Sequence, residues 1–295
     1  MINLEGLRTW AGLAGASLED ADVVVAGIPY DGSAVYRKGA AAAPGRVRRL
    51  SAVMPPVTES GRLLTGLRVH DLGDLPVGPD IEHGWPDVTT RLLAAPARSV
   101  VTVIGGDHCS TIPILAAQAR RHPGLAVLWV DAHPDLCDSS RGSRWSCGCA
   151  LRRGLEAAGM EAGSAAIVGG RDFDPEELDF IRANDMLLLT AAQVADDPRL
   201  AGRRIVDWAA RRPLHVSFDI DFLDPAYAPG TEIPSAGGPS TRQALSLLAE
   251  IADGSRLVGL DVAEVSPPAD SADITSLAAL KLIFEFWGWA WKPPT

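Results

Sequence analysis

The feature that most constrains the fold is a repeated order in which short apolar runs alternate with helix-like segments. Leu125 to Val130 is one such run; it is too short for a helix and follows Pro123-Gly124, so we predict a buried strand. Polar residues come directly after this and other apolar runs. Strands that alternate with helices form mostly parallel sheets with right-handed crossovers and helices on both faces. The expected architecture is therefore a three-layer α/β/α fold.

The alternation extends over most of the chain and predicts a sheet of about eight strands. The predicted strands are Ala21 to Ile28, Arg68 to Leu72, Ser99 to Ile104, Leu125 to Val130, Ala165 to Gly169, Met186 to Leu189, Leu214 to Phe218 and Arg256 to Leu260. The predicted helices are Ala40 to Ser51, Pro86 to Ala95, Thr111 to Arg121, Cys149 to Gly159, Pro175 to Asn184, Asp197 to Arg211, Thr241 to Ala252 and Ser271 to Phe286. We expect an exposed leader at 1–20 and an aromatic tail at 287–295 that serves packing or an oligomer contact. No linker or repeat interrupts the pattern, which favours one domain over 1–295.

Composition excludes several classes of partner. A hydrophobic fraction of 47% with 22% charged residues is typical of a globular chain. The net charge of -10 argues against nucleic acid and anionic membranes as partners. The chain begins with no basic segment followed by an apolar one, and no apolar run could span a bilayer, so we expect a cytoplasmic protein. Its four cysteines lack the C-x-x-C spacing of a structural zinc site and are expected to be free thiols.

Side chains that can bind metal follow three of the predicted strands. His108 follows the strand that ends at Ile104; Asp131, His133 and Asp135 follow the strand that ends at Val130; Asp219 and Asp221 follow the strand that ends at Phe218. The carboxyl ends of parallel strands lie along one edge of a sheet, where ligands bind. Residues two apart on an extended segment point the same way. These side chains are therefore expected to converge.

Four carboxylates and two imidazoles in one place require compensation of charge. Any one of these residues alone is more typical of a helix cap, a turn or a core histidine. Together, the carboxylates would repel each other and raise each other's pKa values, whereas two divalent cations would cancel the charge. Oxygen ligands with a minority of imidazoles suit Mn²⁺. Two such ions can share a bridging hydroxide. The sequence thus predicts a binuclear metal site.

The motifs around these residues resemble those of the ureohydrolases, the family of arginase and agmatinase, from about Ala21 to the final helix. They are Gly105-Gly106-Asp107-His108, Asp131-Ala132-His133-Pro134-Asp135, Ser217 through Pro225, Ala228-Pro229-Gly230-Thr231, Gly237-Gly238 and Asp261 through Pro267. Gly27-Ile28-Pro29-Tyr30-Asp31, Arg37-Lys38-Gly39 and Gly45 through Ser51 are similar to the agmatinase branch.

The resemblance implies an arginase-like catalytic domain that binds two Mn²⁺ ions and forms trimers or hexamers. Its metal ligands would be His108, Asp131, His133, Asp135, Asp219 and Asp221. Asp135 would also hydrogen-bond the bridging hydroxide and move its proton. Glu264 would hold the substrate guanidinium, because a carboxylate can accept two parallel N–H bonds from that planar cation.

The sequence departs from the family pattern beside the expected pocket. Cys147 stands where a proton-shuttling histidine is usual, and Cys109 where a serine is usual. A thiol has an ordinary pKa of about 8.5 and is a poorer proton shuttle at neutral pH, so Cys147 is a candidate catalytic residue, a metal-binding thiolate or mere filling. Glu232-Ile233-Pro234-Ser235 replaces Gly-Thr-Pro-Glu. Glu232 and Asp174, which lies in a segment resembling the one that touches the far end of the substrate in arginase, are candidate substrate contacts.

These departures shape the expected function. The leading hypothesis is a binuclear manganese amidinohydrolase that cleaves a guanidino C–N bond by metal-activated hydroxide and releases urea. Its substrate would be a non-standard one, such as an N-hydroxyguanidino or guanidino-acid compound. One alternative is a formiminoglutamate-type hydrolase, which would release formamide. Another is a catalytically silent homologue that binds metal.

Overall fold

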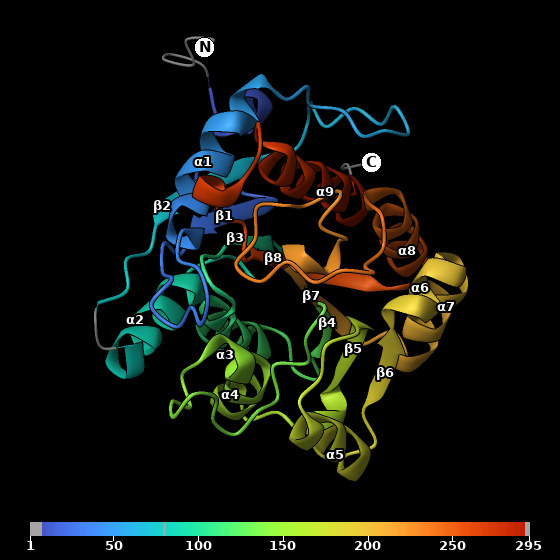
Figure 1. Ribbon diagram of the computed structural model, residues 1–295. Coiled ribbons are helices and arrows are strands. Elements are labelled where there is room, and N and C mark those ends of the chain that lie inside the picture. Colours follow the sequence, from blue (N-terminus) through green and yellow to red (C-terminus); the bar gives the residue numbers. More distant parts are fainter. Residues whose placement is uncertain (1–7, 79–80, 293–295) are drawn as a thin grey trace.

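The computed structural model describes residues 8–78 and 81–292, and its centre is one eight-stranded sheet (Figure 1). The strand order is β2-β1-β3-β8-β7-β4-β5-β6, and every neighbouring pair is parallel. The strands are β1 Val23–Gly27, β2 Val69–Asp74, β3 Val100–Ile104, β4 Ala126–Val130, β5 Ala165–Gly170, β6 Leu187–Thr190, β7 Pro213–Asp219 and β8 Arg256–Ala263. The predicted eight-stranded, mostly parallel sheet is confirmed.

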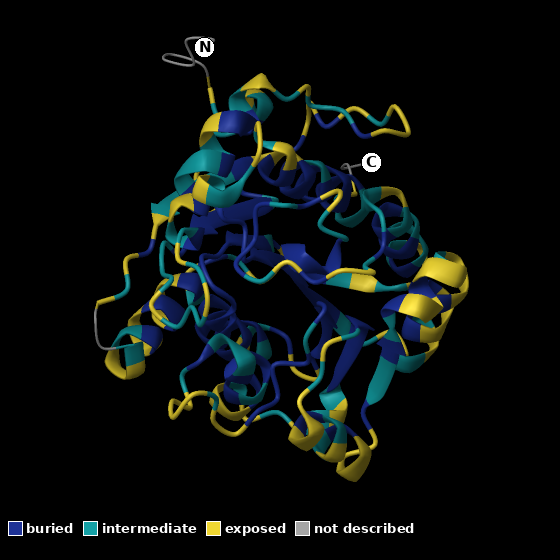
Figure 2. Cartoon of the chain, in the orientation of Figure 1, coloured by how far each residue is buried: buried dark blue, intermediate teal, exposed yellow. Residues whose placement is uncertain are grey.

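Helices cover both faces of the sheet, which confirms the three-layer architecture (Figure 1). They are α1 Ala43–Leu50, α2 Ile81–Leu93, α3 Thr111–Arg121, α4 Ala150–Ala158, α5 Pro175–Ala183, α6 Ala191–Asp196, α7 Pro198–Ala209, α8 Thr241–Gly254 and α9 Ile274–Ala290. Helices α1 and α6 to α9 contribute to the core on one face, and α2 to α5 to the core on the other. Successive strand residues alternate between these cores, as Leu128 and Trp129 do, because side chains along a strand point to opposite faces. The buried residues accordingly concentrate around the sheet (Figure 2).

Several element boundaries differ from the sequence-based predictions. Helix α2 begins at Ile81, so Pro86 lies inside the helix and not in its first turn. Trp85 and Val88 are buried in this helix, and their packing compensates for the hydrogen bond that proline cannot donate. The short helix α6 was not predicted; Thr190 accepts a hydrogen bond from the Gln193 N–H and caps it.

The predicted end of the final helix at Phe286 is wrong, because α9 continues to Ala290; the expectation that the aromatic residues pack is confirmed for Trp287. Trp287 is fully buried, and Gly288 lets the helix approach Thr58, whose Cγ2 would lie 2.3 Å from a Cβ at that position. This segment therefore packs in the core; residues 293–295 of the predicted tail lie outside the described residues.

The predicted leader is also only partly exposed. Residues 1–7 lie outside the described part, but Trp10 is fully buried. Its backbone N–H donates to Ser51 Oγ at 2.7 Å, and its Nε1–H donates to Asp71 Oδ2 at 2.7 Å. The chain therefore joins the core before the first strand.

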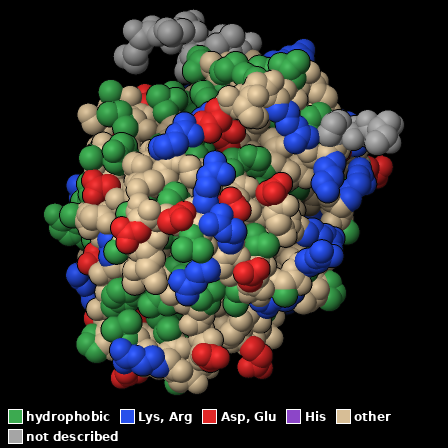
Figure 3. Space-filling model, turned by 90° about the vertical axis from the view of Figure 1, so that its right-hand side faces the viewer, with side chains coloured by type: hydrophobic (Ala, Val, Ile, Leu, Met, Phe, Trp, Pro, Cys, Tyr) green, Lys and Arg blue, Asp and Glu red, His purple; other side chains and the backbone are tan. Residues whose placement is uncertain are grey.

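The surface carries charges of both signs. On the face in Figure 3, Lys and Arg side chains are interspersed with Asp and Glu. Within residues 8–78 and 81–292, no helix combines the length and apolar character that crossing a membrane requires.

Candidate metal centre and substrate pocket

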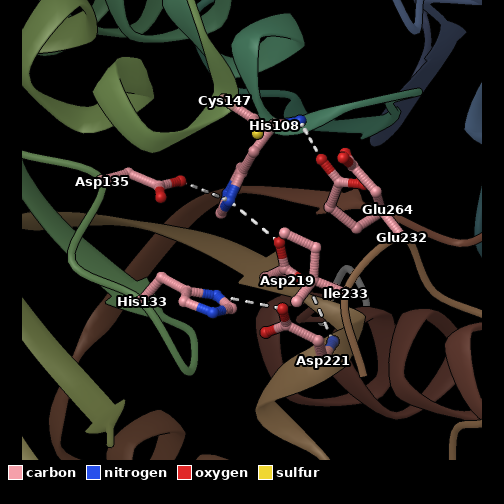
Figure 4. Close-up of a pocket in the computed structure, with 9 residues that line it drawn as sticks. All are labelled: His108, His133, Asp135, Cys147, Asp219, Asp221, Glu232, Ile233 and Glu264. Atoms are coloured by element: carbon pink, nitrogen blue, oxygen red, sulfur yellow. Dashed lines mark hydrogen bonds and ion pairs between the residues drawn. The ribbon is translucent and has the colours of Figure 1, made fainter. Parts of the chain in front are cut away.

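The candidate site lies at the carboxyl ends of the central strands, where β3, β8, β7 and β4 are neighbours. Five of the six predicted metal ligands come from the segments that follow β3, β4 and β7, Asp219 is the last residue of β7, and Glu264 follows β8. A pocket at this edge is lined by His108, His133, Asp135, Cys147, Asp219, Asp221, Glu232, Ile233 and Glu264 (Figure 4). The tertiary structure thus brings together residues that are up to 156 positions apart.

His108 is the centre of one ligand group. Its Nδ1 lies 3.0 Å from Asp131 Oδ2, 3.1 Å from Asp219 Oδ2 and 3.3 Å from Asp135 Oδ2. Among the described residues, neither His108 Nδ1 nor Asp131 Oδ2 has a hydrogen-bond partner of good geometry, although both are buried. Buried polar atoms are rarely left unpaired, so a cation is the expected partner.

The other ring nitrogen of His108 fixes its tautomer. Ser217 Oγ donates to Asp261 Oδ2 at 2.9 Å, so it accepts the proton of His108 Nε2, which lies 3.0 Å away. This leaves a lone pair on Nδ1, aimed at the carboxylates. Such an arrangement is characteristic of a metal-binding histidine.

A second ligand group shares Asp131 with the first. His133 Nδ1 lies 3.1 Å from Asp221 Oδ2 and 3.4 Å from Asp131 Oδ1. Asp131 therefore offers one carboxylate oxygen to each group. Donor atoms of His108, Asp131 and Asp219 lie within 4.8 Å of one another, as do those of Asp131, His133 and Asp221, so each set could hold one ion. The residues fit a binuclear centre, to which Asp131 would contribute a ligand atom for each ion.

The uncompensated carboxylates disturb one another. Burial, with the neighbouring charge of Asp131, raises the pKa of Asp135 to about 8. Burial also raises the pKa of Asp219, and the charges of Asp221 and Asp131 add to this rise. Burial is the larger cause of both shifts, and the neighbouring carboxylates add the repulsion that the sequence predicted without cations.

Two residues of the site adopt the left-handed backbone conformation that is unusual for residues other than glycine. Asp135 has a φ of 53° and Glu264 a φ of 63°. Strained conformations of this kind are concentrated at functional sites, where the surrounding structure holds them in place. The Glu264 N–H donates to Gly106 O at 2.8 Å, which supports its position.

Cys147 lines the pocket beside the predicted ligands (Figure 4). Burial raises the pKa of its thiol, and the carboxylates of Glu264 and Asp135 raise it further. The protein groups around Cys147 therefore favour the protonated thiol and not the thiolate that the sequence left open.

An outer cavity of about 340 Å³ adjoins the metal pocket and shares His133, Asp135, Cys147 and Ile233 with it. Asp174 lines this cavity and not the metal pocket. Asp172 and Phe173, from the same segment as Asp174, line it too. Further residues of the outer cavity that sequence reasoning did not identify are Val35, Cys137, Ser140, Arg141, Gly148 and Glu177. Most lie in loops, where no periodic pattern shows which way a side chain points.

Cys137, Asp174 and Glu177 form another acidic cluster, but Glu177 already has partners. Its two oxygens accept the backbone N–H groups of Leu136 at 2.9 Å and Asp174 at 2.8 Å. These bonds hold the start of α5, which begins at Pro175, so the cluster has a structural role.

Comparison with known proteins agrees with this geometry. The sequence matches the Arginase family over residues 21–288. Proclavaminate amidinohydrolase from Streptomyces clavuligerus is 34% identical over 269 residues, covering 88% of this chain and 85% of that protein. Guanidinopropionase from Pseudomonas aeruginosa is 35% identical over 269 residues, covering 88% and 83%. Agmatinase from Neisseria meningitidis serogroup C is 33% identical over 276 residues, covering 90% and 86%.

The fold is similar as well. The solved structure of the Streptomyces clavuligerus proclavaminate amidinohydrolase has a TM-score of 0.89 against this chain at 32% identity. The match covers 98% of this chain and 99% of that one. The similarity therefore includes the whole sheet and the loops that carry the site.

Proposed function

Because this chain belongs to the arginase family of ureohydrolases, which hydrolyse C–N bonds of linear amidines, we propose that it cleaves a guanidino substrate and releases urea. The observation that carries the proposal is the pair of ligand groups that share Asp131 beside the unpaired carboxylate oxygen of Glu264. The first feature suits two metal ions, and the second suits a planar cation.

Two Mn²⁺ ions are the proposed cofactor. The donors are mainly carboxylate oxygens with two imidazoles, and this set favours a hard divalent cation over zinc bound by thiols. When bound, the ions would supply the positive charge that activates a water molecule and compensates the carboxylates. His108, Asp131, Asp135 and Asp219 would hold one ion, and Asp131, His133 and Asp221 the other.

The remaining residues bind the substrate and move the proton. Glu264 faces the pocket with one free oxygen and would accept N–H bonds from the guanidinium. Asp135 lies beside the metal ligands and would take the proton of the attacking water. The water oxygen bonds to the guanidino carbon, the carbon–nitrogen bond to the rest of the substrate breaks, and the proton goes to the leaving nitrogen. The products are urea and an amine.

Two features of the pocket narrow the range of candidate substrates. Arg141 lines the outer cavity and could pair with a carboxylate at the far end of a guanidino acid. Where the family usually has a histidine that donates a proton, this chain has the Cys147 thiol, whose raised pKa makes it a weaker acid. A weaker acid favours a leaving group that needs less protonation than an alkylamine. The proposed substrates are guanidino acids, which Arg141 favours over agmatine with its cationic far end, and N-hydroxyguanidino compounds.

The test is a product assay on Mn²⁺-loaded protein. The panel contains agmatine, arginine, 4-guanidinobutyrate, 3-guanidinopropionate, N-hydroxyarginine and formiminoglutamate, with urea, hydroxyurea and formamide all measured. We expect urea from a guanidino acid or hydroxyurea from N-hydroxyarginine, and neither product from the Asp135→Asn variant. Formamide alone would establish the formimino alternative. A protein that binds two Mn²⁺ ions and turns over nothing would be a silent homologue.

A further inference from the structure

Besides the candidate metal ligands and Glu264, the metal pocket is lined by one further buried carboxylate, that of Glu232. Glu232 lies beside Glu264 in Figure 4, and both line the same pocket. Glu232 is 2% exposed and Glu264 is 4% exposed. The resemblance to the agmatinase branch predicts a glycine at position 232, so this carboxylate is an addition that the family pattern does not explain.

Each of these carboxylates has one oxygen engaged and one oxygen free. Glu264 Oε1 accepts the His108 N–H at 2.8 Å. Glu232 Oε1 accepts the Tyr36 N–H at 2.6 Å and the Val35 N–H as well. Both Oε2 atoms are buried and have no hydrogen-bond partner within the described part of the chain. A buried carboxylate oxygen without a donor is costly, so a ligand with donors is expected between them.

The backbone on both sides of Glu232 is held firmly. Arg37 Nε donates to Glu232 O at 3.0 Å, and an Arg37 terminal nitrogen donates to Thr231 O at 3.0 Å. Together with the bonds from Val35 and Tyr36, these contacts tie Glu232 to the loop after β1. The free oxygen therefore keeps its direction before any ligand arrives, which lowers the entropic cost of binding.

A monosubstituted guanidinium matches this arrangement. It has two unsubstituted NH₂ groups, one for each free oxygen, while its third nitrogen carries the rest of the molecule toward the outer cavity. A monosubstituted formimino group has only one NH₂ group and presents a C–H on another side. A water molecule could donate to both oxygens but would leave their charge uncompensated.

We propose that Glu232 is a second anchor for the substrate guanidinium, so that Glu232 and Glu264 together select substrates with two unsubstituted terminal nitrogens. The proposal rests on the proposed function and deepens it, because it favours guanidino acids over formimino substrates and over N-hydroxyguanidino compounds, in which one terminal nitrogen carries a hydroxyl. It also assigns to this chain a specificity-determining residue that the family pattern lacks.

The test measures binding of two small probes to the Mn²⁺-loaded protein by calorimetry. Methylguanidinium has two NH₂ groups and N-methylformamidinium has one. We expect wild type to bind methylguanidinium about tenfold more tightly than N-methylformamidinium. Glu232→Gln keeps an acceptor for the Tyr36 N–H but removes the charge, so methylguanidinium binding should weaken about tenfold and the preference should shrink. The KM of a guanidino substrate should rise by a similar factor, with a smaller change in kcat.

Two further variants separate anchoring from loop support. Glu59→Gln removes a carboxylate that pairs with Arg242 outside the pocket and should leave probe binding unchanged. Arg37→Ala loosens the loop but keeps the Glu232 carboxylate, so its effect on probe binding should be clearly smaller than that of Glu232→Gln. Equal losses in Arg37→Ala and Glu232→Gln would show that Glu232 only supports the loop, and the proposal would be wrong.

Failure of this proposal can be told from failure of the proposed function. If wild type releases urea but Glu232→Gln binds both probes like wild type, the enzyme function stands and the second anchor is refuted. If no substrate is turned over but Glu232→Gln still binds methylguanidinium more weakly than wild type, Glu232 is an anchor for guanidinium in a protein that binds the ligand without cleaving it.

Discussion

His215 Nε2 lies 2.6 Å from Asp261 Oδ1, and both side chains are fully buried beneath the metal pocket. The other oxygen of Asp261 accepts hydrogen bonds from Ser217 Oγ at 2.9 Å and Thr111 Oγ1 at 2.8 Å. Since Ser217 accepts a hydrogen bond from His108, a series of hydrogen bonds connects the carboxylate of Asp261 to a candidate metal ligand. His215 orients this carboxylate, and its own Nδ1 accepts from Gln118 Nε2 at 3.2 Å.

Asp261→Asn is expected to weaken Mn²⁺ binding by about 10- to 100-fold, because the chain that sets the tautomer of His108 loses its charged acceptor. The measurement is the Mn²⁺ affinity of purified protein by calorimetric titration. Asp253→Asn, at an exposed position of α8, is the control and should bind like wild type. An unchanged Mn²⁺ affinity in Asp261→Asn would show that the hydrogen bonds from Asp261 to His108 do not influence metal binding.

Metal stoichiometry should distinguish the shared ligand from an unshared one. Asp131→Asn replaces one carboxylate oxygen with an amide nitrogen and removes the negative charge that both groups share, so it is expected to leave neither ion tightly bound. His133→Asn affects one group and should leave about one ion per chain. Metal analysis after gel filtration gives the ratios. Retention of two ions by Asp131→Asn would contradict a bridging role.

Removal of metal should lower the melting temperature at neutral pH, because the buried carboxylates then repel one another without compensation. Mn²⁺ at a thousand times its dissociation constant should raise the free energy of unfolding by about 4 kcal/mol. Thermal unfolding with EDTA and with increasing Mn²⁺ measures this. Equal melting temperatures under both conditions would argue against a metal bound in this pocket.

The stability of the protein should fall between pH 7 and pH 5, partly because of His122. Burial, together with the charges of Arg121 and Arg256, lowers the pKa of His122 from its ordinary value of 6.5 to about 4. The unfolded chain therefore binds a proton in this range that the folded chain does not, and unfolding becomes easier as the pH falls. The expected loss of unfolding free energy is about 2 kcal/mol from pH 7 to pH 5.

Urea unfolding of wild type and His122→Gln at both pH values isolates this contribution. The variant lacks the titrating group, so its loss on acidification should be smaller than that of wild type by about 2 kcal/mol. Parallel losses in the two proteins would mean that His122 does not contribute.

Cys147→His should raise kcat/KM on agmatine by about 100-fold or more, because an imidazole with a pKa near neutrality can protonate an alkylamine leaving group. Steady-state assays of urea release compare this variant with wild type. Cys147→Ser introduces a group of similar size without an imidazole and should give no such gain. If Cys147→His gains nothing on agmatine, the preference for other substrates must have a different origin.

Much of the site could be predicted before the structure was known. Short apolar runs and the polar residues directly after them are local features, and parallel strands bring their carboxyl ends to one edge. This reasoning placed His108, Asp131 and Asp219 in one site, and in the structure an oxygen of each aspartate lies 3.0 or 3.1 Å from His108 Nδ1. Helix ends were less predictable, since α2 and α9 extend as far as core packing favours them.

The sequence by itself therefore determined the layered fold, the number of strands and the residues that stand at the strand ends, because these depend on short-range periodicity. Only the tertiary structure decided that β8 lies between β3 and β7, which sets Glu264 beside His108. It also decided that Glu232 accepts the Tyr36 N–H, a contact across 196 positions. Loop residues have no period to reveal their direction, and their partners are fixed only when distant segments pack together.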